Sequence, residues 1–310
     1  MGVLIIILLL LGIIYYSANS ISSDGSSRNS PAQAPAPTPR PAQTPTPAPA
    51  PEIKKYDKDF LDLCSSGTAE AVQAAIPSLK DAHEKDNTGK INMALSAALI
   101  AAAMNNSDEG VFKALIDAGA DVKMKTSDGR TALLTAITNP SRNPKILDVL
   151  ISAGSDVNTR DNERFTPLMV AAMPPFDNSR VIKTLINAGA DVEATQNLAF
   201  QDNSGSATYN ALTYAIASGN AQNVRAIIEA GADVNKQLKG SDLKNGRFVN
   251  IYMYPLHDAI GHGIEILKLL LDAGAYVNAR NFWGNTPLHT AQMNGKIEEA
   301  RFLESRGATL

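Results

Sequence analysis

The sequence predicts an all-α fold, a solenoid of about seven stacked helix-turn-helix units. The first observation behind this prediction is a recurring string, Ala-Gly-Ala-Asp-Val or a variant of it, whose glycines lie 33 to 43 residues apart. Such a period is typical of solenoids, in which each unit contacts only its neighbours. The second observation is the helical periodicity of the apolar residues between the strings. The strings lie at Ala118–Val122, Ala153–Val157, Ala188–Val192, Ala230–Val234, Ala273–Val277 and Arg306–Leu310.

The last unit shows how one repeat is built. Thr286 can cap a first helix through its hydroxyl, and Pro287 suits the first helical position, where no amide donor is needed. A second helix is expected over residues 297–304, and Gly307 then supplies the left-handed turn that ends it. The same plan predicts upstream first helices that begin after Thr131, Thr166, Asn210 and Tyr254. The tyrosine lacks the short polar side chain of a good cap, which predicts a weaker helix start there.

These residues resemble the ankyrin repeat. The family pattern Thr-Pro-Leu-His-x-Ala, followed by a helix, a glycine and Asp-Val-Asn, is met almost fully at Thr286–Ala291 and partly in the four or five units before it. The resemblance covers about 250 of the 310 residues. It implies L-shaped helix–helix–hairpin units whose hairpin tips and first helices form a concave binding surface. It also implies that His257 and His289 are structural, with rings that hydrogen-bond the backbone of a hairpin.

The segments that join one string to the next first helix, called fingers below, differ in length. A finger takes 10 residues from Asp121 to Thr131, but 19 from Asp191 to Asn210 and 21 from Asp233 to Tyr254. The extra residues lie around 194–208 and 236–252. Long loops within compact arrays are more often functional than idle, so both insertions are candidate binding elements.

The candidate binding residues lie at the finger tips and in the second insertion, because exposed aromatic and arginine side chains often dominate protein interfaces. They are Trp283, Phe282, Arg247, Phe248, Tyr252, Arg164 and Phe165. An alternative for Phe248 and Tyr252 is that they pack on the base of their own insertion. The basic character of this insertion suits an acidic or phosphorylated partner surface. The function expected is non-catalytic recognition of a protein partner; a passive spacer, or an enzyme or small-ligand binder, are the alternatives.

Composition argues against several other classes of function. The net charge is −3, with 28 basic and 31 acidic residues and no basic patch, so no nucleic-acid partner is expected. The chain offers no Ser/His/Asp arrangement, no Gly-rich phosphate loop and no Cys/His cluster, so neither catalysis nor a metal or other cofactor is expected. Its single cysteine, Cys64, is expected to be a buried apolar residue.

Three regions are expected, and the repeat domain occupies residues 57–310. Residues 1–21 form a signal peptide or a membrane anchor, because residues 2–16 are apolar or aromatic without a charge. Residues 22–56 form a disordered linker that is rich first in serine and then in proline and alanine; nine of residues 31–51 are proline. We expect a membrane-anchored protein with its array in the periplasm or outside the cell, or alternatively a secreted or periplasmic protein after signal cleavage.

Overall fold

A computed structural model of the chain describes residues 55–85, 91–139, 143–173, 177–199, 205–244 and 247–310. These residues belong to one compact unit, which spans 53–310. The expected membrane segment at 1–21, and residues 22–54 of the expected linker, lie outside the described residues. Residues 55–56, which the sequence places in the linker, instead begin the first described helix. Within the described ranges, no helix is both long and apolar enough to cross a lipid bilayer.

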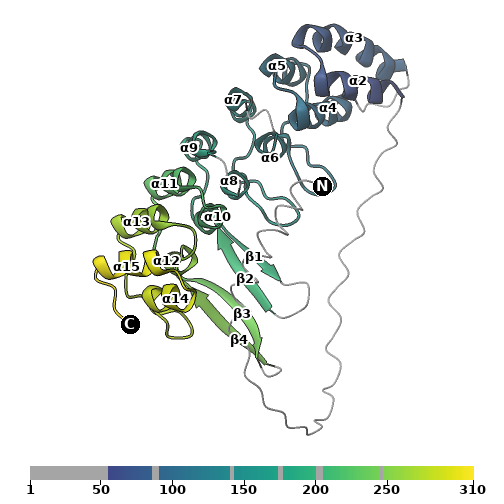
Figure 1. Cartoon of the computed structure of the whole chain (residues 1–310). Helices are drawn as coiled ribbons and strands as arrows, with labels where there is room; N and C mark the ends of the chain where they lie inside the picture. Colours follow the sequence, from purple (N-terminus) through teal and green to yellow (C-terminus); the bar gives the residue numbers. More distant parts are fainter. Residues whose placement is uncertain (1–54, 86–90, 140–142, 174–176, 200–204, 245–246) are drawn as a thin grey trace, which may run out of the picture. The chain divides into compact units, whose positions relative to one another are not determined.

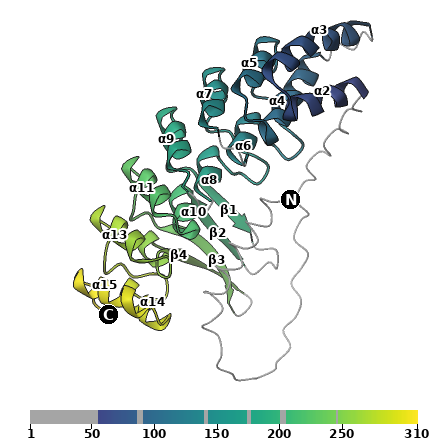
Figure 2. The same ribbon diagram turned by 45° about the horizontal axis from the view of Figure 1, so that its top comes forward.

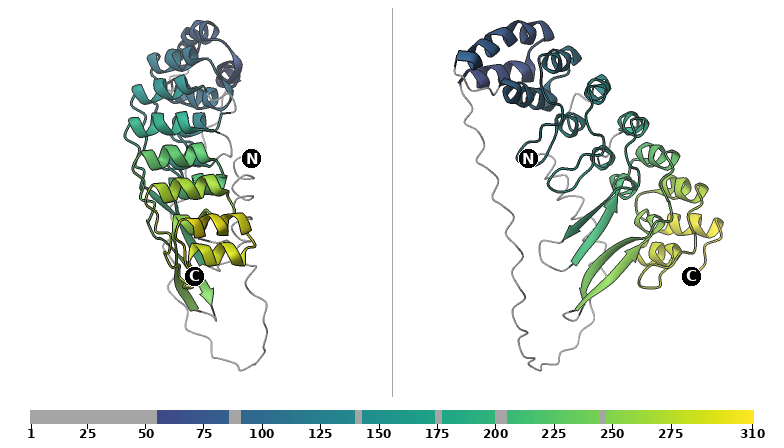
Figure 3. Two further views of the ribbon diagram at one scale, coloured as in Figure 1. Left: turned by 60° about the vertical axis from the view of Figure 1, so that its left-hand side comes forward. Right: turned by 180° about the vertical axis from the view of Figure 1, so that it is seen from behind.

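The fourteen described helices form seven pairs, which confirms the predicted repeat plan. Helices with even numbers form an inner row and those with odd numbers an outer row, and each helix from α4 onward contacts its counterpart in the next pair (Figures 1 and 2). Figure 3 shows the outer helices stacked one above another. The pairs are α2 (Lys55–Ser66) and α3 (Ala69–Lys85), α4 (Ile91–Asn105) and α5 (Glu109–Asp117), α6 (Ala132–Ile137) and α7 (Pro144–Ser152), α8 (Pro167–Ala172) and α9 (Ser179–Asn187), α10 (Ala211–Ser218) and α11 (Ala221–Glu229), α12 (Pro255–Asp258) and α13 (Ile264–Asp272), and α14 (Pro287–Met293) and α15 (Ile297–Ser305).

The inner helices begin at the caps that the sequence predicts. The hydroxyls of Thr131, Thr166 and Thr286 each accept a hydrogen bond from the amide three residues later. Asn210 forms a reciprocal capping box with Thr213. The side chain of Tyr254 makes no capping bond, and the helix that follows it, α12, has only four residues. The predicted weakness of this helix start is therefore confirmed.

The recurring glycines end the outer helices. All six adopt a left-handed backbone, with φ between 86° and 111°. Gly189, for example, has a φ of 90°, and its amide donates to the carbonyl of Ile186 in the last turn of α9. Only glycine adopts this conformation without strain, which explains why the repeat keeps it. Between these turns, buried Leu, Ile, Val and Ala side chains fill the space between the two rows of helices.

The two long fingers are β-hairpins, and the all-α prediction is incomplete here. The first insertion forms β1 (Thr195–Ala199) and β2 (Gly205–Asn210), and the second forms β3 (Leu238–Lys244) and β4 (Arg247–Met253). The four strands join in the order β1-β2-β3-β4 as one antiparallel sheet, called the finger sheet below. The sheet projects from the array near α10 and α12, away from the outer helices (Figures 1 and 3).

A glycine allows the two hairpins to join. Gly240 on β3 lies opposite Ala207 on β2, and a Cβ atom at this glycine would be 2.4 Å from the carbonyl oxygen of Ser206. One pair farther along, the hydroxyls of Ser206 and Ser241 are 3.1 Å apart and hydrogen-bonded. Small residues thus let the fingers of two consecutive units form one continuous surface.

Candidate protein-binding surface

Three of the predicted binding residues form an aromatic cluster at the base of the second insertion. The rings of Tyr252 and Phe282 meet edge to face with centroids 6.0 Å apart, and those of Phe282 and Trp283 meet likewise at 5.8 Å. The amide of Phe282 also donates to the carbonyl of Tyr252 at 3.2 Å. Trp283 is 46% exposed, as expected for a finger tip, whereas Tyr252 and Phe282 are half-buried. The finger of the last unit therefore supports the finger sheet and presents the tryptophan beside it.

The strand register adds a cation to this cluster. Lys239 on β3 lies directly opposite Tyr252 on β4, so the two side chains share one face of the sheet. Lys239 is exposed, whereas Leu238, its neighbour on the other face, is buried. Lys236, just before the strand, is already paired with Glu193 at 2.5 Å. The exposed lysine is thus the cation that the described part of β3 presents beside the aromatic rings.

The other predicted tip, at Arg164 and Phe165, serves a different role. Arg164 is exposed and has a φ of 69°, in a turn position that Gly129 and Gly284 fill in other fingers. Phe165 is only 2% exposed and packs against the ring of Tyr214 with centroids 5.7 Å apart. The expectation of Phe165 as a surface contact is wrong, because this ring faces the core. Its burial follows from α10, which carries Tyr214 in the inner row.

The base of the first insertion is held by buried polar bonds. Gln196 on β1 is 1% exposed. Its side-chain Nε2 donates to the carbonyl of Glu163 at 2.5 Å, and its Oε1 accepts from the hydroxyl of Tyr214 at 2.5 Å. Arg160 donates to the carbonyl of Thr195 at 2.9 Å. The preceding finger thus fixes β1, in the same way that the finger after the sheet fixes β4.

Arg247 and Phe248 lie at the start of β4, in register with Lys244 and Leu243 of β3. Both residues therefore belong to the sheet, at the opposite end of β4 from Met253, where the strand meets the helical array. Their side chains lie outside the described residues. Their expected part in binding stays a prediction.

Two ionisable residues on α12 have shifted pKa values. Burial raises the pKa of Asp258, on α12, to about 7. Burial lowers the pKa of His257 from its ordinary value, although the bond between its Nε2 atom and the carbonyl of Asn285 opposes this effect. That contact, at 2.9 Å, is the structural role expected for His257. Its counterpart His289 is exposed, and the role expected for its ring stays a prediction.

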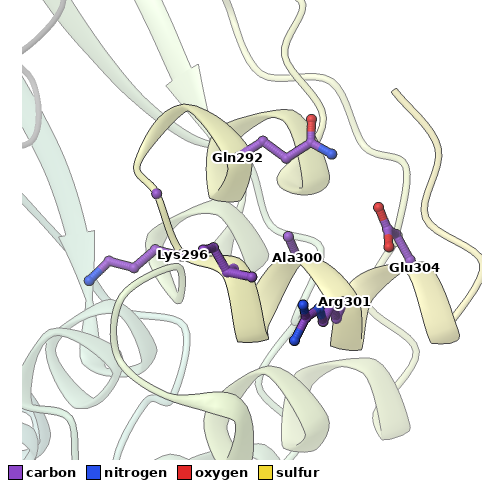
Figure 4. Close-up of a pocket in the computed structure, with 7 residues that line it drawn as sticks. Gln292, Lys296, Ala300, Arg301 and Glu304 are labelled. Carbon is purple, nitrogen blue, oxygen red and sulfur yellow. The ribbon is translucent and has the colours of Figure 1, made fainter.

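The remaining candidates for chemistry are few. Cys64 is fully buried, and burial raises the pKa of its thiol to about 12, which makes it an inert core residue. The described ranges contain no group of three or more His, Cys, Asp or Glu side chains that could hold a metal ion. A shallow pocket lies on the last helix pair, apart from the finger sheet (Figure 4). Its lining includes Gln292, Lys296, Ala300, Arg301 and Glu304, and neither its residues nor their arrangement points to a reaction.

Several residues that build this surface are missed by sequence reasoning. Gln196, Tyr214 and Gly240 are those residues, and they hold the sheet in place. The alternation of Leu238 and Lys239 is a signal for a strand, but it is too short to distinguish a strand from an irregular loop.

Comparison with known proteins identifies the repeats. A family model for ankyrin repeats in three copies matches residues 61–161 and 140–238, and a model for a single ankyrin repeat matches residues 252–282. The chain belongs to the ankyrin repeat family. Ankyrin repeats are protein–protein interaction modules and are generally non-enzymatic, and the inner-helix and finger arrangement described above is that of their array.

Relatives support the family and the fold. A putative ankyrin repeat protein of Rickettsia bellii (strain RML369-C) is 38% identical over 72 residues, 22% of this chain and 30% of that protein. Serine/threonine-protein kinase VIK of Arabidopsis thaliana is 46% identical over 54 residues, 17% of this chain and 12% of the kinase. These matches span less than a third of either relative. The crystal structure of an ankyrin repeat domain from Acinetobacter baumannii AYE is similar with a TM-score of 0.54 and 29% identity, over 68% of this ankyrin chain and 98% of that one.

Proposed function

We propose that this ankyrin array is a non-catalytic recognition module that binds a protein partner through its fingers, with the finger sheet and Trp283 at the centre of the contact. The observation that carries the proposal is the joining of two inserted fingers into one sheet beside an exposed aromatic cluster. Insertions that served only as linkers between helices would not need to form hydrogen bonds with the insertion of the next unit. Exposed tryptophan beside well-supported aromatic rings is typical of the residues that dominate binding energy.

In-cell photo-crosslinking tests this proposal. A photoreactive amino acid would replace Trp283 or Lys239 on the finger side, or Lys268, an exposed residue on the outer helix α13, as the control. We expect both finger positions to capture the same protein and the outer position not to capture it. Equal capture from all three positions, or no defined product from the two finger positions, would contradict the proposal.

We also propose that residues 1–21 attach the array to a membrane, with residues 22–54 as a spacer and the array on the periplasmic or outer side. The support is the uncharged apolar run at 2–16 and the proline-rich sequence that follows it. The alternative is a signal peptide that is removed during export. Alkaline extraction of membranes, combined with the mass of the mature chain, separates the two: a retained, full-length chain supports the anchor, and a released, shortened chain supports cleavage.

A further inference from the structure

Among the residues that the structure describes, the two outer strands of the finger sheet, β1 and β4, each have one edge that pairs with no further strand. Alternate residues of an antiparallel strand point their backbone groups to opposite sides. On β1, the carbonyl of Thr195 bonds Arg160 outside the sheet, so Thr195, Asn197 and Ala199 face outward. On β4, the carbonyl of Tyr252 bonds Phe282 outside the sheet, so Tyr252, Asn250 and Phe248 face outward.

The β4 edge continues well past the finger that touches it. The tip of that finger is the turn at 281–284, closed by the bond from the amide of Gly284 to the carbonyl of Asn281 at 2.8 Å. Beyond its contact at Tyr252, the strand runs on through residues 247–251. At about 3.4 Å per residue, this is about 17 Å of strand edge. On β1, the backbone carbonyl of Thr195 is likewise bonded, and residues 196–199 continue beyond it, so the two edges are similar in length. The choice between them rests on charge, because residues 195–210 of the first hairpin include no Lys or Arg.

From this geometry we propose that the β4 edge binds an extended acidic segment of the partner, which adds to the finger sheet as a fifth strand. The inference rests on the proposed function and specifies that the partner binds by adding a strand to the sheet. The amide of Phe282 already makes the first bond of such an added strand, to the carbonyl of Tyr252. A peptide strand that begins beside Trp283 would continue this ladder of hydrogen bonds along Asn250 and Phe248. In strand addition, such backbone hydrogen bonds supply the affinity.

The charge of the second hairpin selects an acidic segment. Residues 236–247 contain four basic residues and one acidic residue. Even without Lys236, which is paired with Glu193, the hairpin keeps an excess of positive charge. Lys239 and Tyr252 share one face of the sheet, and every second side chain of an added strand would lie on that same face. Two copies of this chain paired through β4 would instead bring like charges together, which is unfavourable.

A defined peptide tests the inference on the full chain in mild detergent. The probe is a fluorescent seven-residue peptide that alternates glutamate and valine, and its lysine–valine counterpart is the charge-reversed control. Asn250→Pro removes one outward amide of β4, whereas Asn250→Ala keeps it. Asn197→Pro removes the matching amide of the β1 edge. An outward-facing proline on an edge strand leaves the ladder to the inner strand in place.

We expect saturable binding of the acidic peptide, reduced about tenfold or more by Asn250→Pro and unchanged by Asn250→Ala and Asn197→Pro. Hydrogen exchange should also show that the amides of Asn250 and Phe248 become protected when the peptide binds wild type, a result that does not depend on how the proline variant folds. The inference would be overturned if the acidic peptide did not bind saturably, if the basic peptide bound equally well, or if Asn197→Pro reduced binding as much as Asn250→Pro. It would also be overturned if the amides of β4 were not protected, or if the wild-type chain formed a dimer that Asn250→Pro dissociates. Specific capture of a partner from Trp283 and Lys239 would still support the proposed function in those cases.

Discussion

The side-chain amide of Asn235 donates to the carbonyl of Gly274, 39 residues later, at 2.9 Å. Its oxygen accepts from the amide of Tyr276 at 2.8 Å. One asparagine at the start of a finger thus clamps the turn that ends the outer helix of the next unit. Asn158 and Asn278 make the same pair of bonds to the units that follow them. The Asp-Val-Asn part of the repeat therefore has a stacking role.

Replacing Asn235 by alanine should weaken this contact between units. Two hydrogen bonds are lost at a partly exposed site, and each contributes about 0.5–1.5 kcal/mol. We expect the free energy of unfolding, measured by urea denaturation, to fall by about 1–2 kcal/mol. The control is Asn197→Ala on the finger sheet, an exposed side chain that makes a long 3.5 Å hydrogen bond with Thr208. Equal effects of the two substitutions would contradict the clamp.

Replacing Gly189 by valine should destabilise the turn after α9 through backbone strain alone. Its φ is 90°, and no atom lies within 4 Å of the position that a Cβ would take. A β-branched residue in this conformation costs on the order of 1–3 kcal/mol. The matched control is Ala188→Val, one residue earlier, where φ is −84°. A melting temperature for Gly189→Val equal to that of the control would argue against the left-handed turn.

Replacing Gly240 by valine should separate the two hairpins without unfolding the helices. The added side chain would collide with the carbonyl of Ser206 on the neighbouring strand. We expect faster hydrogen exchange in β2 and β3 while the helical circular dichroism stays near the wild-type value. Ser241→Val, which removes the hydroxyl pair with Ser206 at a residue that already carries a Cβ atom, serves as the comparison. Unchanged exchange in Gly240→Val would show that the hairpins do not depend on this close approach.

Asp258 should make stability depend on pH. Its pKa is raised from 3.8 to about 7 in the folded chain, so between these values the folded state binds more protons than the unfolded state. The free energy of unfolding therefore falls as pH rises through this window, by up to about 1.4 kcal/mol per pH unit. Asp258→Asn removes the dependence, so its stability relative to wild type should increase between pH 5 and pH 8.

Parallel urea titrations at the two pH values check this prediction. His257 acts in the opposite sense, because its lowered pKa destabilises the folded chain when the pH falls. It is present in both proteins, so its contribution cancels in the difference between Asp258→Asn and wild type. A difference in stability that stays constant from pH 5 to pH 8 would show that the carboxyl is not held neutral.

The helix pairs could be predicted from sequence because their signals are local. Thr286 and Pro287 mark a helix start, and Gly307 marks a helix end, within one repeat. The finger sheet could not, because it depends on contacts between insertions of two units, such as Gly240 against Ser206. Phe165 shows the same limit: its place at a finger tip suggested exposure, but the ring of Tyr214, 49 positions later in the sequence, buries it. The length of the finger locates the second hairpin as an insertion, but the sequence does not show that Tyr252 packs against Phe282 of the next finger.

A binding titration measures whether the finger side recognises a protein partner. The partner captured by crosslinking at Trp283 would be purified and titrated with the wild-type chain, with Trp283→Ala and with Lys268→Ala. Removal of an interface tryptophan typically costs about 2 kcal/mol or more, so we expect Trp283→Ala to weaken binding about thirtyfold and Lys268→Ala to have no effect. Equal dissociation constants for all three chains would contradict it.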